Sequence, residues 1–196
     1  MNEPDWDAGT ENAYEAHRTR VEGLCERCGE NAPLPDSDSE LFERFAPYVA
    51  RIGLRLLGRE SDVDDLIQDV FIAAMRQRHQ VRAPEAFRSW LAIIAVRTAR
   101  RYLRKRRLRA LVGIDTLAPT LELRDHGMSP ERRALLQRVY QVLDKIPVDQ
   151  RIAWTLRYVE GEKLEEVAER CGCSLATAKR RIAAAHGRLE AELHDG

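Results

Sequence analysis

The chain has 196 residues, of which 44% are hydrophobic and 33% charged, a composition typical of a globular, helix-rich protein rather than a disordered one. No apolar run approaches the roughly 20 residues that a membrane span needs. The acidic start MNEPDWDAGTENAYE is not a secretory signal, so we expect a cytoplasmic protein without membrane insertion. The net charge is zero, but residues 1–40 hold eleven acidic residues and three arginines, which leaves +8 on the rest. A basic body of this kind favours a polyanionic partner.

Residues 1–38 lack a clear helical pattern and end in the turn-rich NAPLPDSDS, which predicts an acidic, disordered extension. Cysteines occur as the pairs Cys25/Cys28 and Cys171/Cys173. A structural zinc site normally takes four ligands, and neither pair has a second pair nearby in the sequence. We therefore expect plain thiols and no metal, and a redox or metal role for the first pair stays a weaker hypothesis.

Helical periodicity begins at residue 39, where apolar residues lie three and four apart until Gly58 closes the segment. Ser61 is expected to cap a second helix, DVDDLIQDVFIAAM, whose single apolar stripe packs on one side. The opposite face of this helix holds Asp65, Gln68 and Asp69.

A third helix is expected after the loop RQRHQVRAPEA, with Pro84 in its first turn, and completes a domain over residues 39–109. Its apolar stripe runs from Phe87 to Tyr102 and interleaves with a dense basic block, RTARRYLRKRRLR. Such a block needs solvent, acidic neighbours or a polyanionic partner. Because the stripe places the first half of the block on a folded helix, we interpret that half as a nucleic-acid surface. Its residues are Arg97, Arg100, Arg101 and Arg104.

Residues 110–128 lose the periodicity and contain glycine and proline, which predicts a linker. Ser129-Pro130 then begins a second domain over residues 129–193, because serine is a good cap and proline suits the first helical turn. Pro147 opens the next helix of this domain.

The second domain ends in two short helices separated by Cys171-Gly172-Cys173. A tight turn at Gly172 and a second helix capped at Ser174 predict a helix-turn-helix. In such a unit the second helix enters the major groove with its N-terminal residues on base edges. We expect Leu175 and Ala178 to face the core. The residues expected to contact DNA are Ser174, Ala176, Thr177, Lys179, Arg180 and Arg181. Taken alone, these features also suit an ordinary helical hairpin with a basic solvent face.

Three stretches, in this order and spacing, strongly resemble the bacterial extracytoplasmic-function (ECF) sigma factors: DVDDLIQDVFIAAMRQ, FRSWLAIIAVRTARRYLRKRR and IPVDQRIAWTLRYVEGEKLEEVAERCGCSLATAKRRIAAAHGRLEAEL. The first two are similar to the family's second region and the last to its fourth. The resemblance implies an all-α fold of two helical domains joined by a flexible linker. It also implies a promoter-recognition subunit that joins core RNA polymerase, has no catalytic residues, cofactor or small-molecule substrate, and is held inactive by an anti-sigma factor.

The resemblance also implies roles for particular residues. The face that docks on the coiled coil of the largest polymerase subunit comprises Asp65, Gln68, Asp69 and Phe71. The loop 78–86 is similar to the segment that captures a flipped base of the minus-ten element, and its polar candidates are His79, Gln80 and Arg82.

The basic block matches the family's face over the melted promoter strand, and the helix from Ser174 matches the reader of the minus-thirty-five element. Lys105 and the residues up to Arg109 are expected either to attract phosphates without sequence preference or to form a frayed helix end. Trp90 could stack on single-stranded DNA, but its place on the apolar stripe favours core packing.

The main alternative class of protein is a DNA-binding regulator that acts without polymerase. A conventional helix-turn-helix regulator would bind duplex DNA alone, usually as a dimer, and would not need the acidic helix face. An enzyme finds little support, because the sequence has no phosphate-binding glycine loop, no metal-spaced histidine cluster and no evident Ser/His/Asp set. A further hypothesis is that the acidic extension folds back on the basic body and weakens DNA binding.

Overall fold

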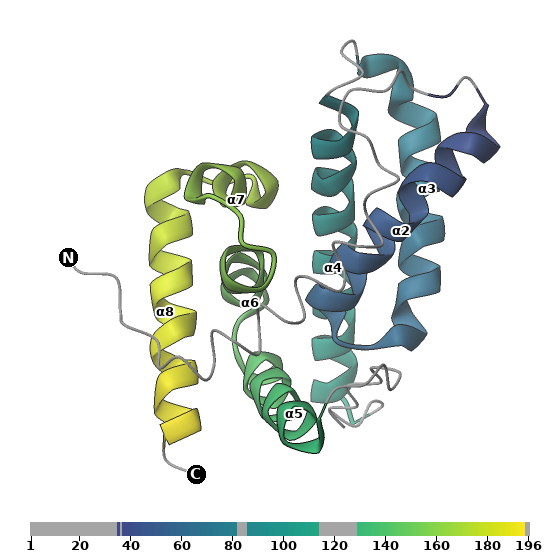
Figure 1. Cartoon of the computed structure of the whole chain (residues 1–196). Coiled ribbons are helices and arrows are strands. Elements are labelled where there is room, and N and C mark those ends of the chain that lie inside the picture. Colours follow the sequence, from purple (N-terminus) through teal and green to yellow (C-terminus); the bar gives the residue numbers. More distant parts are fainter. Residues whose placement is uncertain (1–34, 36, 82–85, 114–128, 195–196) are drawn as a thin grey trace.

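The computed structural model of the chain describes residues 35, 37–81, 86–113 and 129–194, and every regular element in this part is helical. The helices form two groups (Figure 1). The first domain contains α2 (Asp38–Leu57), η1 (Glu60–Asp62), α3 (Val63–Gln77), η2 (Arg78–Gln80) and α4 (Phe87–Leu111). The second domain contains α5 (Pro130–Lys145), α6 (Val148–Trp154), the π-helical turn η4 (Thr155–Val159), α7 (Leu164–Cys171) and α8 (Leu175–His194). The predicted all-α fold of two helical domains is confirmed, while most of the expected linker, residues 114–128, lies outside the described residues, as does the extension up to residue 34.

α2 begins and ends where local signals in the sequence place its ends. The Ser37 hydroxyl accepts a hydrogen bond from the Glu40 amide at 3.1 Å, which caps the first turn. Gly58 ends the helix with φ = 70°, and its N–H donates to the Leu54 carbonyl at 2.8 Å. The prediction of a helix end at Gly58 is therefore confirmed.

The start of α3 differs from the prediction that Ser61 caps it. Residues 60–62 form the 3-10 turn η1, and α3 begins at Val63 without a side-chain cap. The Val63 N–H donates to the Glu60 carbonyl. A backbone carbonyl of η1 thus accepts a hydrogen bond at the start of the helix, where a capping serine hydroxyl was expected to be the acceptor.

α4 is the central helix of the molecule and is covered from two sides. It packs against α2 and α3 of its own domain, and also against α6 and α7 of the second domain. The predicted stripe is buried at Phe87, Leu91, Ile94 and Thr98, but the small residues between them are buried as well. The predicted stripe therefore describes only part of the buried surface of α4, because the alanines beside it are buried against a second layer of helices. Pro84 lies outside the described residues.

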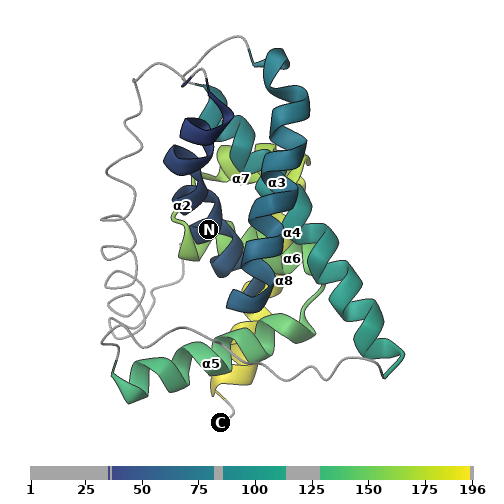
Figure 2. The same cartoon turned by 90° about the vertical axis from the view of Figure 1, so that its right-hand side faces the viewer.

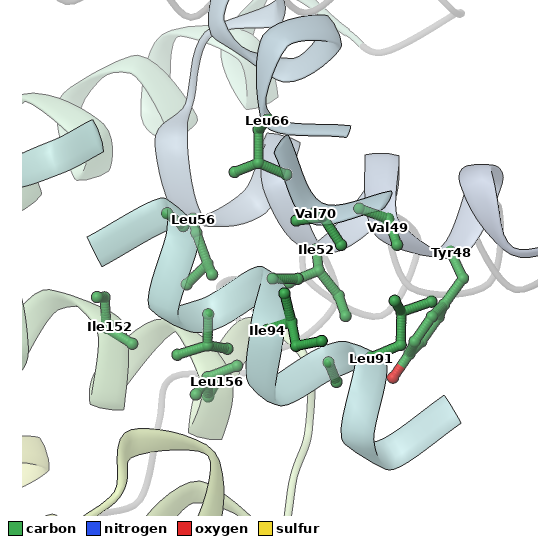
Figure 3. Close-up of a cluster of buried hydrophobic side chains, with 14 of the residues drawn as sticks. Tyr48, Val49, Ile52, Leu56, Leu66, Val70, Leu91, Ile94, Ile152 and Leu156 are labelled. Atoms are coloured by element: carbon green, nitrogen blue, oxygen red, sulfur yellow. The ribbon is translucent and has the colours of Figure 1, made fainter. Parts of the chain in front are cut away.

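The two domains share one hydrophobic core. Ile152 and Leu156 of the second domain belong to the same buried cluster as Leu56 and Ile94 of the first (Figure 3). A smaller cluster, around Trp154, lies within the second domain, between α5, α6 and α8. In Figure 2, α5 runs across the lower end of the molecule. The domains are therefore packed together in this structure rather than held apart.

The second domain ends in the predicted helix-turn-helix. α7 stops at Gly172, which has φ = 63°, and α8 starts three residues later. A residue with a Cβ is strained at such a positive φ, so glycine is the suitable residue for this turn. None of the helices in the described part of the chain is long and apolar enough to cross a membrane.

Candidate nucleic-acid interface

The N-terminus of α8 is fixed by a small hydrogen-bond network. The Ser174 hydroxyl accepts from the Thr177 amide at 3.3 Å and donates to the Thr177 hydroxyl at 3.0 Å. The Cys173 amide donates to the Ala168 carbonyl at 3.0 Å, which closes the turn from α7. Ser174 is therefore the cap of α8, as predicted, and the turn holds the helix end in one orientation.

The residues that the sequence assigns to DNA contact surround this helix end. Thr177 and Arg181 are half-buried, whereas the others are exposed: Ser174, Ala176, Lys179 and Arg180. Ala178 is fully buried, as expected. The expectation for Leu175 is wrong, because its side chain is 37% exposed. It lies in the first turn of α8, and the buried stripe of that helix begins one turn later.

The basic face of α4 adjoins the acidic face of α3. Arg101 Nη2 lies 2.7 Å from Asp69 Oδ2, and the Tyr102 hydroxyl donates to the same oxygen at 2.9 Å. Partial burial and this hydrogen bond raise the pKa of Tyr102 to about 12. Arg97 and Lys105 are exposed on the same helix. The residues predicted for DNA and those predicted for polymerase therefore meet along one edge of the first domain.

Three of the predicted DNA-contacting arginines converge on a single carboxylate, that of Asp149 in the first turn of α6. Arg100 Nε lies 2.9 Å from Asp149 Oδ1, and Arg104 Nη2 donates to Oδ2 at 3.1 Å. Arg181 of α8 approaches Oδ2 at 4.0 Å. Arg100 also donates to the Cys171 carbonyl at 2.9 Å. The sequence showed Asp149 only as an acidic residue at a helix start, a common feature that reveals no distant partner.

In the second half of the basic block, Arg106 has a different role from the predicted one. Its side chain is buried and donates to the Leu57 carbonyl at 3.1 Å and to Asp144 at 2.6 Å. Arg107 donates to the Ile146 carbonyl at 3.3 Å. The expectation of phosphate attraction is therefore wrong for Arg106, because its side chain points into the interface between the domains.

The loop after α3 is described only in part. His79 is exposed in η2, while Arg82 and the side chain of Gln80 lie outside the described residues. Trp90 is partly buried against the core, with its ring centroid 5.4 Å from that of Phe87. This placement agrees with the core-packing interpretation of Trp90.

The polymerase-docking candidates on α3 differ in exposure. Asp65 and Gln68 are exposed, whereas Phe71 is buried, with its ring centroid 4.7 Å from that of Phe42. The exposed apolar groups nearby are Ile72, at 51%, and Phe42, at 42%. Phe71 thus packs beneath this candidate surface, and Ile72, one residue further along, is an exposed apolar side chain on it.

The cysteines of the described chain are free thiols: Cys171 is buried and Cys173 half-buried. Burial raises the pKa of Cys171 to about 11, so this thiol is a poor nucleophile and a poor metal ligand at neutral pH. Cys25 and Cys28 lie outside the described residues.

Two family models match the chain: sigma-70 region 2 over residues 41–109 and sigma-70 region 4 over residues 136–189. The ECF RNA polymerase sigma-E factor of Haemophilus influenzae is 34% identical over 160 residues, which cover 76% of this chain and 84% of that protein. The ECF RNA polymerase sigma-E factor of Escherichia coli strain K12 is 33% identical over 152 residues, covering 72% of this chain and 78% of that protein.

Solved structures agree with this fold. The sigma factor RpoE from Bartonella quintana, in complex with the anti-sigma factor NepR, matches with a TM-score of 0.61 and 23% identity over 80% of this chain and 96% of that one. CnrH, in complex with the cytosolic domain of CnrY, matches with a TM-score of 0.55 and 25% identity over 81% of this chain and 88% of that one.

Proposed function

The chain belongs to the ECF family of RNA polymerase sigma factors, and we propose which of its surfaces contact promoter DNA and which contact the polymerase. As a sigma factor it binds core RNA polymerase and promoter DNA and directs transcription initiation. The proposal concerns which residues of this chain make each contact.

The recognition helix α8 reads the minus-thirty-five element in the major groove. The observation that carries this assignment is its N-terminal end, where a capped helix presents exposed Lys179 and Arg180 beside the small residue Ala176. Basic side chains at such a position read guanine or clamp phosphates, and a small residue permits close approach of the backbone.

The first domain holds the melted minus-ten strand and the polymerase. Arg97, Arg101 and Lys105 are exposed along α4 and provide cations for a single-stranded backbone. Asp65 and Gln68, together with Ile72, form an exposed polar and apolar surface on α3 that suits a partner helix rich in arginine. These two surfaces lie side by side, which places the DNA strand next to the polymerase contact.

Control and location follow from the same role. We propose that an anti-sigma factor holds this chain inactive, since the similar sigma factor RpoE from Bartonella quintana was solved in complex with the anti-sigma factor NepR. We also propose that the protein acts in the cytoplasm, where its polymerase partner is found, and that it has no catalytic residues or cofactor of its own.

In vitro transcription with core polymerase and a genomic DNA pool tests the proposed function. We expect the full chain to direct initiation at a discrete set of promoters that share one upstream element. Lys179→Ala combined with Arg180→Ala should abolish initiation there but preserve binding to core polymerase. Arg188→Ala, which removes an exposed charge from the same helix further along, serves as the control. Absence of initiation at every promoter, together with no binding to core polymerase, would overturn the proposal in favour of a regulator that acts on duplex DNA alone.

A further inference from the structure

The three most exposed large apolar side chains of the described residues lie together at the C-terminal end of α4. Leu108 is 63% exposed, Leu111 77% and Val112 60%. Because they are three and four positions apart, they lie on one face of the helix. The Val112 amide donates to the Leu108 carbonyl at 3.3 Å, so the helical hydrogen bonding continues to the last of them. The fold therefore leaves an apolar stripe exposed at this end of α4.

This end of α4 projects away from the body of the molecule. In Figure 2 its last turns extend beyond the other helices, at the lower right. Gly113 follows the cap with φ = 71°, and a Cβ built there would meet no other atom of the described chain within 4 Å. The apolar stripe is therefore on a projecting tip rather than on a surface between packed helices.

Exposed cations flank the apolar stripe on the same part of the helix. They are Lys105, Arg107 and Arg109, and residues 97–113 contain no acidic residue. Arg107 contacts the Ile146 carbonyl, which is a neutral group and leaves the positive charge in place. Residues 105–112, the α4 tip, thus combine apolar side chains with positive charge. This combination is typical of helical segments that lie on the surface of an anionic bilayer.

Other occupants of the α4 tip fit these observations less well. DNA phosphates would account for the cations but not for the exposed leucines, since phosphate contacts are polar. A second copy of the chain would bring like charges together, and these repel. Each partner in a stable protein complex buries about 800 Å² of surface, and three side chains on a projecting tip supply much less. A bilayer surrounds such a tip, so that the apolar groups enter it while the cations stay among the headgroups.

We propose that the α4 tip is a peripheral membrane contact that binds anionic phospholipid bilayers through Leu108, Leu111, Val112 and the cations beside them. The apolar side chains enter the boundary between headgroups and acyl chains, and α4 is not apolar enough to cross the bilayer. Binding by so short a segment is weak and reversible, since even a single acyl chain gives only marginal attachment. This contact is a further activity, separate from promoter recognition.

Flotation of the full-length protein with lipid vesicles tests the proposal. One set of vesicles contains phosphatidylglycerol mixed with phosphatidylcholine, and the other contains phosphatidylcholine alone. Leu108→Ser combined with Leu111→Ser removes two of the three apolar side chains but none of the charge. Leu175→Ser, which removes an exposed apolar side chain from the second domain, is the control. Circular dichroism verifies that each variant keeps its helices, as substitutions at exposed sites should.

We expect wild type to bind the anionic vesicles at low salt and the phosphatidylcholine vesicles at least tenfold more weakly, because each cation near an anionic surface contributes about fivefold. Added salt should release the protein, since it screens this attraction. The double variant should bind the anionic vesicles about tenfold more weakly than wild type, because burial of even one leucine contributes about that factor. Leu175→Ser should match wild type.

A second measurement locates the contact. Leu111→Trp should show a blue shift of its fluorescence on anionic vesicles that exceeds any shift in wild type, because the indole leaves water. Failure of wild type to bind anionic vesicles overturns the proposal, as does equal binding by wild type and the double variant. Loss of core-polymerase binding by the double variant, with no vesicle binding by wild type, overturns it in favour of a protein-docking surface. Transcription by wild type tests the proposed sigma function separately.

Discussion

Arg151 donates two hydrogen bonds to the main-chain carbonyl oxygen of Leu56, from Nε at 3.1 Å and from Nη2 at 2.9 Å. These residues lie 95 positions apart, in different domains. The last carbonyls of a helix lack partners within that helix, and a cation is favourable at its C-terminus. An arginine of the second domain therefore caps a helix of the first where the two domains pack together.

Replacement of Arg151 by methionine should lower the free energy of unfolding by about 3 kcal/mol. The buried Asp144 carboxylate then loses an ion-pair partner, and the α2 carbonyls lose their hydrogen-bond donor. Urea unfolding of the full chain measures this change. Arg188→Met, at an exposed site on α8, should change stability by less than about 0.5 kcal/mol. Equal stabilities of the two variants would contradict the capping role of Arg151.

Gly58 is required by two independent constraints. Its φ of 70° is unfavourable for other residues, and a Cβ at this position would lie 2.5 Å from the Tyr140 ring of α5. Gly58→Ala should therefore cost at least about 1–2 kcal/mol, the usual penalty of a left-handed conformation, with a further loss from displacement of Tyr140.

Gly187→Ala is the matched control for this prediction, because Gly187 lies inside α8 and a Cβ there would meet nothing within 4 Å. It should stabilise the chain by about 0.5–1 kcal/mol. Thermal unfolding of both variants measures the pair, and a stabilised Gly58→Ala variant would contradict the described contact.

Glu162 gives the stability of the second domain a predicted pH dependence. Its side chain is buried beside Arg170, and burial raises the pKa of its carboxyl from 4.5 to about 8, more than Arg170 lowers it. The folded state then binds more protons than the unfolded state between pH 4.5 and 8. The contribution of this group is fully present below pH 4.5 and is lost as the pH rises through 8.

Glu162→Gln should remove this dependence. The free energy of unfolding of wild type is therefore expected to fall, relative to that of the variant, as the pH rises from 5 to 8. Urea unfolding at several pH values measures the difference between the two proteins, which cancels the titration of all other groups. If the difference stays constant, or grows in favour of wild type with rising pH, then burial does not raise the pKa of the Glu162 carboxyl in the folded state.

Ile72 is expected to contribute to polymerase binding without stabilising the fold, because half of its side chain is exposed on α3 beside Asp65 and Gln68. Ile72→Ala should weaken binding to core polymerase about fivefold or more, as truncation of an interface apolar residue commonly does. Leu108→Ala, at a site on α4 that is 63% exposed, should leave binding unchanged. Fluorescence anisotropy with labelled full-length protein compares them, and equal affinities would remove Ile72 from the docking surface.

Local features of the sequence predicted the elements with local causes. Gly58, Gly172 and the cap at Ser174 each depend on neighbours within a few residues, and each was predicted in its observed role. The prediction that Ser61 caps a helix was wrong, because a 3-10 turn occupies residues 60–62. The prediction that Leu175 is buried was wrong, because the buried stripe of α8 begins one turn later.

The interface between the domains could not be predicted in this way. Asp149 meets Arg104 across 45 positions, and Asp144 meets Arg106 across 38. The sequence shows that these side chains carry opposite charges but not which of them come together. The second half of the basic block was therefore left open between phosphate contact and a frayed helix end, although Arg106 lies in the interface between the domains.

The distance between the domains tests the whole account most directly. Donor and acceptor dyes can be attached through unnatural amino acids at Ser89 of α4 and Ala184 of α8, which are both exposed. We predict high energy transfer in the free full-length chain and a large loss of transfer when core polymerase and promoter DNA are added together. Equal transfer in the free chain and in a complex that is active in transcription would contradict the account.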